Sequence, residues 1–282
     1  MVPGLTSDSQ AASPHAFATL VTNTDYALGA RALLRSLRMT GTTADCVVLH
    51  TGAVTARDLA PLVRLGARLV HVDLLPTSEA FNARHARRAL HCAAPFDKGG
   101  KPSFHTPLDN FVKLRLWQLV EYEALVFIDA DAVVLRNCDD LFERHGFNAA
   151  PNVYESLSDM ARMNSGVFTA RPSLERFDDM LDRLDRPDMF WRRTDQTFLQ
   201  DYFPDWAGLP MADNMLQYVW FALPHLWHWN SVRIVHYQYE KPWQSDHGKA
   251  EQLAPLIALW RAYAGDGPPP DLTALPAPPA RP

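Results

Sequence analysis

The sequence contains only three cysteines, Cys46, Cys92 and Cys138, which are widely spaced and odd in number. This pattern favours neither a disulfide framework nor a structural metal site, so we expect reduced, partly buried thiols. The first residues lack a basic stretch followed by an apolar one, and no stretch approaches the roughly 18 apolar residues of a membrane span. We therefore expect a cytoplasmic protein without a membrane span.

Long basic runs are also missing, and the formal net charge is -5. A protein whose main partner is nucleic acid usually presents a basic patch or stripe, so the composition argues against that class. A negatively charged substrate would need local positive charge from a metal ion or from a few basic side chains. No nucleic-acid partner is therefore expected.

What the chain does contain is a repeated alternation of buried strands and helices. It has 282 residues, of which 47% are hydrophobic, and this is compatible with one large α/β domain or two small ones. Buried-strand patterns occur at Phe17–Thr22, Cys46–His50 and Arg68–Leu75, and Thr55–Leu65 is a helical pattern between the last two. Such alternation predicts an α/β protein with a largely parallel sheet.

The ends of the chain and one internal segment depart from this pattern. Residues 1–15 have no periodicity and predict a flexible N-terminal arm, residues 16–264 predict the folded domain, and the Pro-rich residues 265–282 predict a disordered tail. Residues 76–107 also lose the pattern, and long loops of this kind are often lids or binding loops.

The most informative stretch is ALVFIDADAVVL, which runs from Ala124 to Leu135. Its apolar start predicts a strand buried on both faces, directly followed by Asp129 and Asp131. In an extended chain both aspartates would point to the same side, with Cα atoms roughly 6.5 Å apart, where a divalent cation could bind both. The alternative is an ordinary solvated turn, since a short Asp-x-Asp pattern gains weight only from its setting.

Polar residues follow two other predicted strands. Thr22, Asn23 and Tyr26 come after the first strand, where ligands collect in open α/β sheets, although Asn-Thr-Asp is also an ordinary helix cap. His236 comes at the end of a strand over Val232–Val235. It is either a structural histidine or a nitrogen ligand that completes a mixed site for manganese.

Three further positions have two interpretations each. Lys113 lies on a predicted helix that begins near Asp109, in which Val112, Leu116, Leu119 and Val120 would form one apolar face. It either reaches a phosphate or sugar oxygen or is solvated. Gly166 either lets a ligand approach the backbone or forms a bulge. Asp195, which follows a potential cap at Thr194, faces either solvent at a helix N-terminus or the site.

Several motifs occur in one order: FATLVTNTDYALGA, DNFVKLRLW, VFIDADAVVLRNCDDLF, NSGVF, TDQTFL and VHYQYEKPW. Together they resemble glycosyltransferase family 8 over roughly Phe17 to Trp243. The resemblance implies a GT-A fold, which is a single Rossmann-like domain with a mostly parallel central sheet flanked by helices. It also implies a metal-dependent, retaining transfer of a hexose from UDP-glucose or UDP-galactose to a hydroxyl acceptor.

The resemblance also implies roles for individual residues. It places Leu20, Thr22, Asn23 and Tyr26 around the uridine. It assigns Asp129, Asp131 and His236 as ligands of Mn²⁺ (or Mg²⁺). Around the sugar and diphosphate it places Lys113, Ala130, Asn164, Ser165, Gly166, Asp195, Gln196 and Lys241. Of these, Asp195, Gln196 and Lys113 are the catalytic candidates and Lys241 would meet the diphosphate. The acceptor stays unidentified, and a homodimer is compatible with the resemblance.

The sequence departs from the family pattern in two places. Family members commonly carry a glycine between the metal histidine and Lys-Pro-Trp, which allows the backbone to approach the phosphate, whereas this chain has HYQYEKPW. Glycogenin, a family member, primes itself on a tyrosine, and here only Tyr218 is a candidate. Because Tyr218 lies in an apolar run, we expect it to be buried and the acceptor to be a separate molecule.

Two alternatives come from other classes of protein. An Asp-x-Asp after an apolar strand is also typical of haloacid-dehalogenase-type phosphatases, although in them the motif normally opens the domain. A non-catalytic protein that binds nucleotide sugars with the same fold is the other alternative. A test for UDP-sugar turnover and for phosphomonoester hydrolysis separates these hypotheses.

Overall fold

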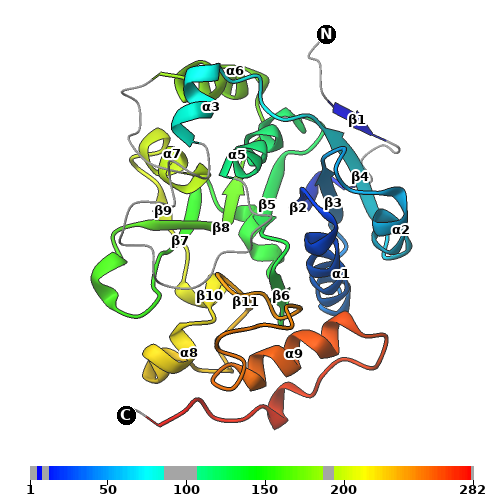
Figure 1. The fold of residues 1–282 in the computed structure, drawn as a ribbon, viewed down its shortest axis with the longest axis vertical. Helices are drawn as coiled ribbons and strands as arrows, with labels where there is room; N and C mark the ends of the chain where they lie inside the picture. Colours follow the sequence, from blue (N-terminus) through cyan, green and yellow to red (C-terminus); the bar gives the residue numbers. More distant parts are fainter. Residues whose placement is uncertain (1–4, 8–12, 86–106, 187–193, 281–282) are drawn as a thin grey trace.

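The central feature of the fold is an eight-stranded sheet. The computed structural model describes residues 5–7, 13–85, 107–186 and 194–280, whose arrangement is shown in Figure 1. The strand order is β1-β4-β3-β2-β5-β8-β7-β9. These strands are β1 (Leu5–Ser7), β2 (His15–Val21), β3 (Asp45–His50), β4 (Ala67–Val72), β5 (Ala124–Ile128), β7 (Asn148–Pro151), β8 (Met163–Ala170) and β9 (Ala207–Gly208).

Four neighbouring strands, β4, β3, β2 and β5, run parallel, as the alternation of strand and helix patterns predicted. β8 then pairs antiparallel with β5, so the sheet changes direction beside the strand that leads to Asp129. β1 and β7 pair antiparallel with β4 and β8, and β9 pairs parallel with β7. The prediction of an α/β fold with a mostly parallel central sheet is confirmed.

Helices cover both faces of the sheet because its strands alternate apolar side chains between two cores. In β2, Ala16, Ala18 and Leu20 join the core on the side of η1, α6 and α7, whereas Phe17 and Val21 join the core on the side of α1 and α2. The α-helices are α1 (Thr24–Met39), α2 (Ala56–Arg64), α3 (Glu79–His85), α5 (Pro107–Asn110), α6 (Leu174–Leu184), α7 (Asp195–Tyr202), α8 (Val219–Ala222) and α9 (Ala254–Ala264). The 3-10 segments are η1 (Phe111–Gln118), η2 (Asp139–Glu143), η3 (Leu157–Asp159), η4 (Met211–Asn214), η5 (Pro224–Leu226) and η6 (Leu272–Ala274).

A second sheet of three short strands lies below the large one in Figure 1. β6 (Ala132–Val134) pairs antiparallel with β11 (Ile234–His236), which pairs parallel with β10 (Met215–Leu216). A third apolar core packs this sheet against α8 and α9. Because β6 follows the two aspartates and β11 ends at His236, the small sheet brings distant parts of the sequence to one place.

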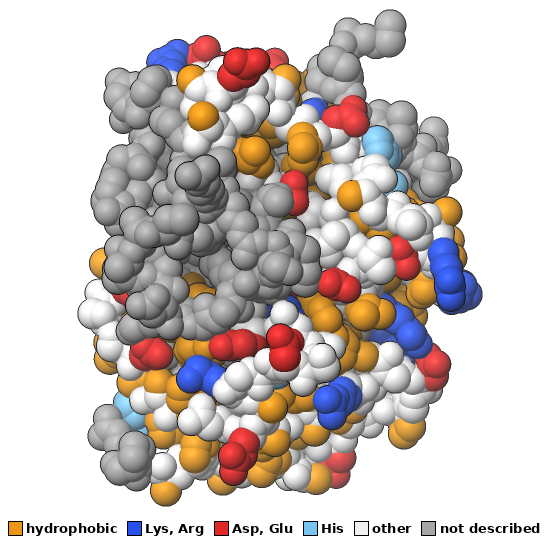
Figure 2. Space-filling model, in the orientation of Figure 1, with side chains coloured by type: hydrophobic (Ala, Val, Ile, Leu, Met, Phe, Trp, Pro, Cys, Tyr) orange, Lys and Arg blue, Asp and Glu red, His pale blue; other side chains and the backbone are white. Residues whose placement is uncertain are grey.

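The surface carries charges of both signs. On the face shown in Figure 2, the described Lys and Arg side chains are interspersed with Asp and Glu and form no continuous patch. Among the helices that the structure describes, none has the length and apolar composition of a membrane-spanning segment.

Both ends of the chain contain structure that composition did not predict. β1 lies within the expected flexible arm and pairs with the edge strand β4, because backbone hydrogen bonding along an open edge needs no side-chain pattern. The expected disordered tail contains η6, and Leu272 and Leu275 pack against the third core. In the same tail, the carbonyl of Pro276 accepts a hydrogen bond from Trp229 Nε1 (2.7 Å). These residues therefore have pairing or packing contacts, while the flexible arm and the disordered tail as a whole stay predictions.

Two internal predictions also differ from the structure. The helix expected from Asp109 is a short α5 followed by the 3-10 segment η1, which is buried on every side and so has no exposed face to make it amphipathic. Within residues 76–107, the described part contains α3, where Phe81 is buried and stacks on His85 (ring centroids 4.0 Å apart). The remainder of that predicted loop, residues 86–106, lies outside the described residues.

Candidate active site

One cavity of about 440 Å³ is lined by every residue to which the sequence assigned a role. It lies where β2 and β5 end, and ligands collect at the carboxyl ends of strands in open α/β sheets. The predicted residues that line it are Leu20, Thr22, Asn23, Tyr26, Lys113, Asp129, Ala130, Asp131, Asn164, Ser165, Gly166, Asp195, Gln196, His236 and Lys241. Their location together agrees with the prediction, and their individual roles stay predictions.

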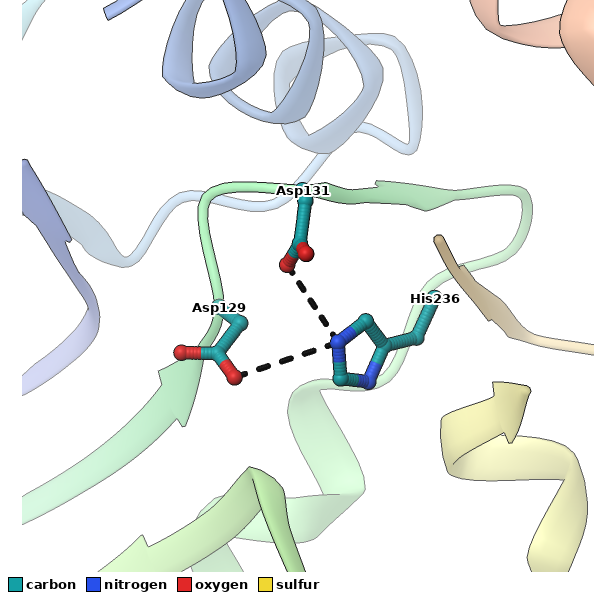
Figure 3. A group of neighbouring side chains, drawn as sticks. All are labelled: Asp129, Asp131 and His236. Carbon is teal, nitrogen blue, oxygen red and sulfur yellow. Dashed lines mark ion pairs between the residues drawn. The ribbon is translucent and has the colours of Figure 1, made fainter. Parts of the chain in front are cut away.

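Asp129 and Asp131 converge through a turn and not through strand alternation. β5 ends at Ile128, and the amide of Ala132 donates to the carbonyl of Asp129 (3.1 Å), so the chain turns before β6 begins. The amide of Asp129 also donates to the carbonyl of Gly166 on β8 (2.8 Å), which ties the turn to the sheet. The expected extended geometry is therefore wrong, although both carboxylates do face one point (Figure 3).

The imidazole of His236 faces both carboxylates. Its Nε2 atom lies 3.3 Å from Asp131 Oδ1 and 3.9 Å from Asp129 Oδ2. One potential ligand atom from each of the three residues lies within 4.8 Å of the others. Two carboxylates and one imidazole form a mixed oxygen and nitrogen donor set, which fits a divalent cation such as Mn²⁺.

Each carboxylate of this cluster is bound by a lysine through its other oxygen. Lys113 Nζ lies 2.9 Å from Asp129 Oδ1, and Lys241 Nζ donates to Asp131 Oδ2. Burial raises the pKa of Asp129, and Lys113 offsets this only in part. Burial would also raise the pKa of Asp131, but Lys241 and His236 outweigh it and hold that pKa below its usual range. Buried ammonium groups therefore stabilise the charged carboxylates.

A chain of amide side chains orients His236. Its Nδ1 lies 2.9 Å from Asn214 Oδ1, and Asn214 Nδ2 donates to Asn164 Oδ1 (2.8 Å). Because the Asn214 amide is fixed by Asn164, its oxygen faces the imidazole and accepts from Nδ1–H. This hydrogen bond fixes the orientation of the ring, with Nδ1 towards Asn214 and Nε2 towards the two carboxylates, where Nε2 could also serve as a metal ligand.

Gly166 has a packing role beside the histidine. A Cβ atom at this position would overlap the His236 ring and would lie 2.8 Å from Asn164 Oδ1. The Gly166 amide donates to that same Asn164 oxygen (2.9 Å). The close approach of the His236 side chain therefore explains this glycine, and the pairing of β7 with β8 is also irregular between Asn164 and Phe168, which agrees with the bulge that the sequence suggested.

Asp195 faces the cavity and not the solvent. It is 2% exposed, accepts a hydrogen bond from Ser165 Oγ (2.7 Å), and lies 3.0 Å from Lys113 Nζ. Lys113 is likewise buried, and its ammonium joins Asp129 to Asp195. Burial would lower the pKa of Lys113, but the two aspartates raise it. Gln196 Oε1 accepts from the amide of Ser165 (3.3 Å), which completes the link between α7 and β8.

The opposite side of the cavity is built from the start of α1. Asn23 is the N-cap of α1, and its Oδ1 accepts from the amide of Tyr26 (3.1 Å). The Tyr26 ring packs edge-on against Trp243 (centroids 5.7 Å apart), and burial, with the nearby Asp131 and Asp129 carboxylates, raises the pKa of Tyr26. Capping and cavity lining therefore occur together at Asn23, so the two interpretations of this segment do not exclude each other.

The sequence did not reveal several residues that shape the site. Asn214, Asn152 and Tyr154 all belong to the hydrogen-bond chain around Asn164, because Asn164 Nδ2 also donates to Asn152 Oδ1 (2.9 Å) and to Tyr154 OH (3.2 Å). They carry no local motif. Gly29 did offer a signal, because an isolated glycine inside a helical pattern often has a packing reason. A Cβ at Gly29 would overlap the carbonyl oxygen of Ala130, in the Asp129 turn.

Comparisons with known proteins agree with this geometry. The sequence model described as glycosyl transferase family 8 matches residues 18–159. Glycogenin-1 of Caenorhabditis elegans is 31% identical over 245 residues, which cover 83% of this chain and 51% of that protein. The putative UDP-glucuronate:xylan alpha-glucuronosyltransferase 5 of Arabidopsis thaliana is 31% identical over 233 residues, which cover 81% of this chain and 36% of that protein. The chain thus spans between about a third and about half of the length of these relatives.

Solved structures share the fold at low sequence identity. The galactosyltransferase LgtC, solved with donor and acceptor sugar analogues, superposes with a TM-score of 0.60 at 14% identity, covering 90% of this chain and 97% of that one. The glycosyltransferase GlyE of Streptococcus pneumoniae, solved in its apo form, also has a TM-score of 0.60, at 15% identity, covering 95% of this chain and 62% of that one. These likenesses show that the fold is of the GT-A type.

Proposed function

Because the chain belongs to glycosyltransferase family 8, we propose that it transfers glucose or galactose from a UDP-sugar to a separate hydroxyl acceptor with retention of the anomeric configuration. The observation that carries the proposal is the cluster of Asp129, Asp131 and His236 in one cavity with Lys113 and Lys241. The cluster offers ligands for a divalent cation, and the lysines offer fixed positive charge. A diphosphate leaving group needs both.

The charge balance supports a role for a cation. Around the cluster, the three carboxylates of Asp129, Asp131 and Asp195 face the two ammonium groups of Lys113 and Lys241, which leaves a net negative charge. Such a site repels a diphosphate unless positive charge is added. Asp129, Asp131 and His236 would hold Mn²⁺ or Mg²⁺, which would neutralise the leaving UDP as a Lewis acid.

Lys241 is placed to assist the same leaving group. Its Nζ binds Asp131 and donates to the carbonyl of Tyr237 (2.9 Å), so the ammonium is held at the edge of the cation cluster. An ammonium at this position stabilises negative charge that develops on a diphosphate, without a proton transfer. A strong general acid is then unnecessary for UDP to depart.

Asp195 would act at the sugar. In the reaction the bond from the anomeric carbon to the UDP oxygen breaks, a bond to the acceptor oxygen forms, and the acceptor proton passes to the departing diphosphate. Asp195 Oδ2 accepts a hydrogen bond from Ser165 Oγ and lies 3.0 Å from the Lys113 ammonium, and these contacts reduce the nucleophilicity of the carboxylate. We therefore favour a role in which the Asp195 carboxylate, with Gln196 beside it, stabilises the positive charge that develops at the anomeric carbon. The alternative, in which the Asp195 carboxylate itself attacks that carbon, is less favoured.

A neutral hexose fits the cavity better than a glucuronate. A sugar carboxylate is usually recognised by arginine through a bidentate contact. In the described lining, Arg162 is the one arginine, and its Nη1 is already paired with Asp159 (3.6 Å). The sugar side is instead lined by Asn164, Asp195 and Gln196, which suit hydroxyl groups.

A separate acceptor is supported by the state of Tyr218. Its ring is 1% exposed, and its hydroxyl donates to Glu240 Oε2 (2.7 Å). Burial, together with that hydrogen bond, raises the pKa of Tyr218 well above its ordinary value. A buried, hydrogen-bonded phenol is a poor acceptor, so we expect no self-glycosylation at this tyrosine.

Calorimetry with UDP tests the proposal directly. We expect UDP to bind in the presence of Mn²⁺ and to bind much more weakly in the presence of a chelator. In a separate turnover assay, we expect UDP-glucose or UDP-galactose to be turned over faster than UDP-glucuronate. Equal UDP affinity in Mn²⁺ and in chelator would contradict the cation assignment. Hydrolysis of a phosphomonoester with Mg²⁺, without any UDP-sugar turnover, would instead favour the phosphatase alternative.

A further inference from the structure

The contacts proposed above for the nucleotide sugar leave one part of the cavity wall without an assigned role. It is formed by the segment between β7 and β8 and by the loop after His236. Two half-buried tyrosines, Tyr154 and Tyr239, line it from these two segments, and the buried Tyr218 packs against Tyr239. This surface, which we call the tyrosine wall, is defined by these three residues.

The backbone of Tyr239 is strained. Its φ is +64°, and it is the one residue other than glycine with a positive φ in the part of the chain that the structure describes. For a bulky side chain this conformation is a genuine outlier that surrounding structure must hold in place. Tyr239 stands in HYQYEKPW, in the stretch between histidine and lysine where the family commonly has a glycine. The loop therefore keeps a glycine-like turn while carrying a large ring.

Packing holds the Tyr239 ring at the cavity. Its centroid lies 5.5 Å from that of Tyr154, at an interplanar angle of 40°, and 5.1 Å from that of Tyr218, at 43°. Tyr154 is in turn fixed by Asn164, whose Nδ2 donates to the tyrosine hydroxyl (3.2 Å). Because Asn164 is a predicted sugar contact, the wall begins where the sugar site ends.

The charges beside the wall are mainly negative. Glu155, Asp159 and Arg162 line the same part of the cavity, and Arg162 is paired with Asp159 (3.6 Å). Burial raises the pKa of Tyr239, and the carboxylates of Glu155, Glu240 and Asp159 raise it further. The phenol thus lies in a negative potential, which disfavours a ligand that carries a carboxylate or phosphate.

We infer that Tyr239 and Tyr154 bind the acceptor as an uncharged sugar, whose C–H face stacks on the two rings beside the donor hexose. The assignment of this sugar as the acceptor rests on the proposed function. The binding of a sugar by the tyrosine wall does not depend on the identity of the donor. Aromatic rings offer large, rigid apolar area to one face of a pyranose, while hydroxyl groups stay in contact with the polar rim. Strain at Tyr239 is consistent with a ring that is held for binding, since residues with such backbone cluster at ligand sites.

Saturation-transfer NMR on the full chain tests the wall with three probes: methyl β-glucoside, methyl β-xyloside and methyl β-glucuronide. Each is titrated with and without UDP and Mn²⁺. Tyr239→Gly and Tyr239→Asn remove the ring but tolerate a positive φ, so both variants should fold, whereas Tyr239→Phe keeps the ring. Thermal unfolding confirms that the variants are folded.

We expect the neutral glycosides to bind wild type, with Tyr239→Gly and Tyr239→Asn weakening them by about tenfold and Tyr239→Phe by less than about twofold. The glucuronide should bind more weakly than the glucoside. Unchanged glycoside affinity in both ring-free variants, no glycoside binding by wild type, or a preference for the glucuronide would each overturn the inference. Failure of UDP to bind in the presence of Mn²⁺ would instead reject the proposed function. The two outcomes can be distinguished because glycoside binding is also measured in the absence of nucleotide.

Discussion

At the scale of single residues, Lys241 would compete with a bound cation for the carboxylate of Asp131. Lys241 Nζ binds Asp131 Oδ2, while Asp131 Oδ1 faces His236. Lys241→Gln removes one positive charge beside the cluster, so Mn²⁺ should bind about tenfold more tightly and UDP in saturating Mn²⁺ about tenfold more weakly. Calorimetry measures both constants, and Lys249→Gln is the matched control. A loss of affinity for both ligands would mean that Lys241 only supports the local structure.

Asn214 determines which nitrogen of His236 faces the carboxylates. Without its oxygen, the Nδ1 proton loses its acceptor (2.9 Å away) and the imidazole can rotate or change tautomer. Asn214→Ala should therefore weaken Mn²⁺ binding by about 10-fold to 100-fold. The measurement is Mn²⁺ calorimetry, with Asn137→Ala, an exposed asparagine, as control. Equal Mn²⁺ affinity in Asn214→Ala would place this residue outside the cation site.

A substitution at Asp195 should separate catalysis from nucleotide binding. Asp195→Asn keeps the shape and the hydrogen bond from Ser165 but removes the charge that faces Lys113. Donor hydrolysis should fall by about 10² to 10³, as when one preorganised electrostatic group is lost, while UDP affinity barely changes. Asp201→Asn, an exposed position on the same helix α7, is the control. Near-normal hydrolysis by Asp195→Asn would show that this aspartate is structural.

The residues that could be predicted from sequence are those with a strong local pattern. Asp129 and Asp131 follow a wholly apolar strand of the large sheet, so their place at its carboxyl edge follows from general rules for α/β folds. His236 ends another apolar strand, but it reaches the aspartates through the pairing of β11 with β6 in the small sheet. Asn214 and Tyr154 follow no such pattern, because their contacts exist only once η4 and the segment before β8 lie beside β11. Long-range contacts of this kind require the tertiary structure.

At the scale of secondary-structure elements, α1 approaches the Asp129 turn closely because Gly29 has no side chain. A Cβ there would overlap the carbonyl oxygen of Ala130 and lie 2.9 Å from the Trp243 ring. A change from glycine to alanine normally stabilises a helix interior by about 1 kcal/mol. Here the overlap of the added Cβ should outweigh that gain, so Gly29→Ala should lower the free energy of unfolding by about 1 to 3 kcal/mol.

Urea unfolding measures the effect of Gly29→Ala. Gly248→Ala, where a Cβ would meet nothing within 4 Å, is the control and should change stability little. A stabilised Gly29→Ala would mean that α1 can move away from the turn without cost. The sign of the change is therefore the test.

Element types were predictable where periodicity was strong. The buried strands β2, β3, β4 and β5 and the helices α1 and α2 lie close to their expected ranges. η1 was expected as an amphipathic helix because its apolar residues recur at helical spacing, yet every one of its residues is buried, polar ones included. Lys113 and Arg115 are buried there because carboxylates and carbonyl groups bind them, and such partners cannot be read from a local window.

At the scale of the whole molecule, buried ionisable groups make stability depend on pH. Burial raises the pKa of the Cys46 thiol from its ordinary value of 9.0 to about 11, and that of Cys138 to about 12. The two thiols belong to the core under α1 and α2. In the unfolded chain both would ionise near their ordinary pKa, so they bind protons more tightly in the folded state.

The sign of the effect follows from this difference in proton binding. Stability from the two thiols is fully present below about pH 9 and is lost as the pH rises through 9 towards 11 and 12, which costs about 1.4 kcal/mol per thiol at pH 10. We therefore expect the double variant Cys46→Ala/Cys138→Ala to lose less unfolding free energy than wild type between pH 7.5 and pH 10, by about 3 kcal/mol. Urea unfolding at the two pH values gives this difference, and the packing cost of the substitutions cancels because it is present at both. Other groups that ionise in alkali, such as buried tyrosines, also cancel because both proteins contain them. Equal losses in the two proteins would show that the thiols ionise as readily in the folded core as in the unfolded chain.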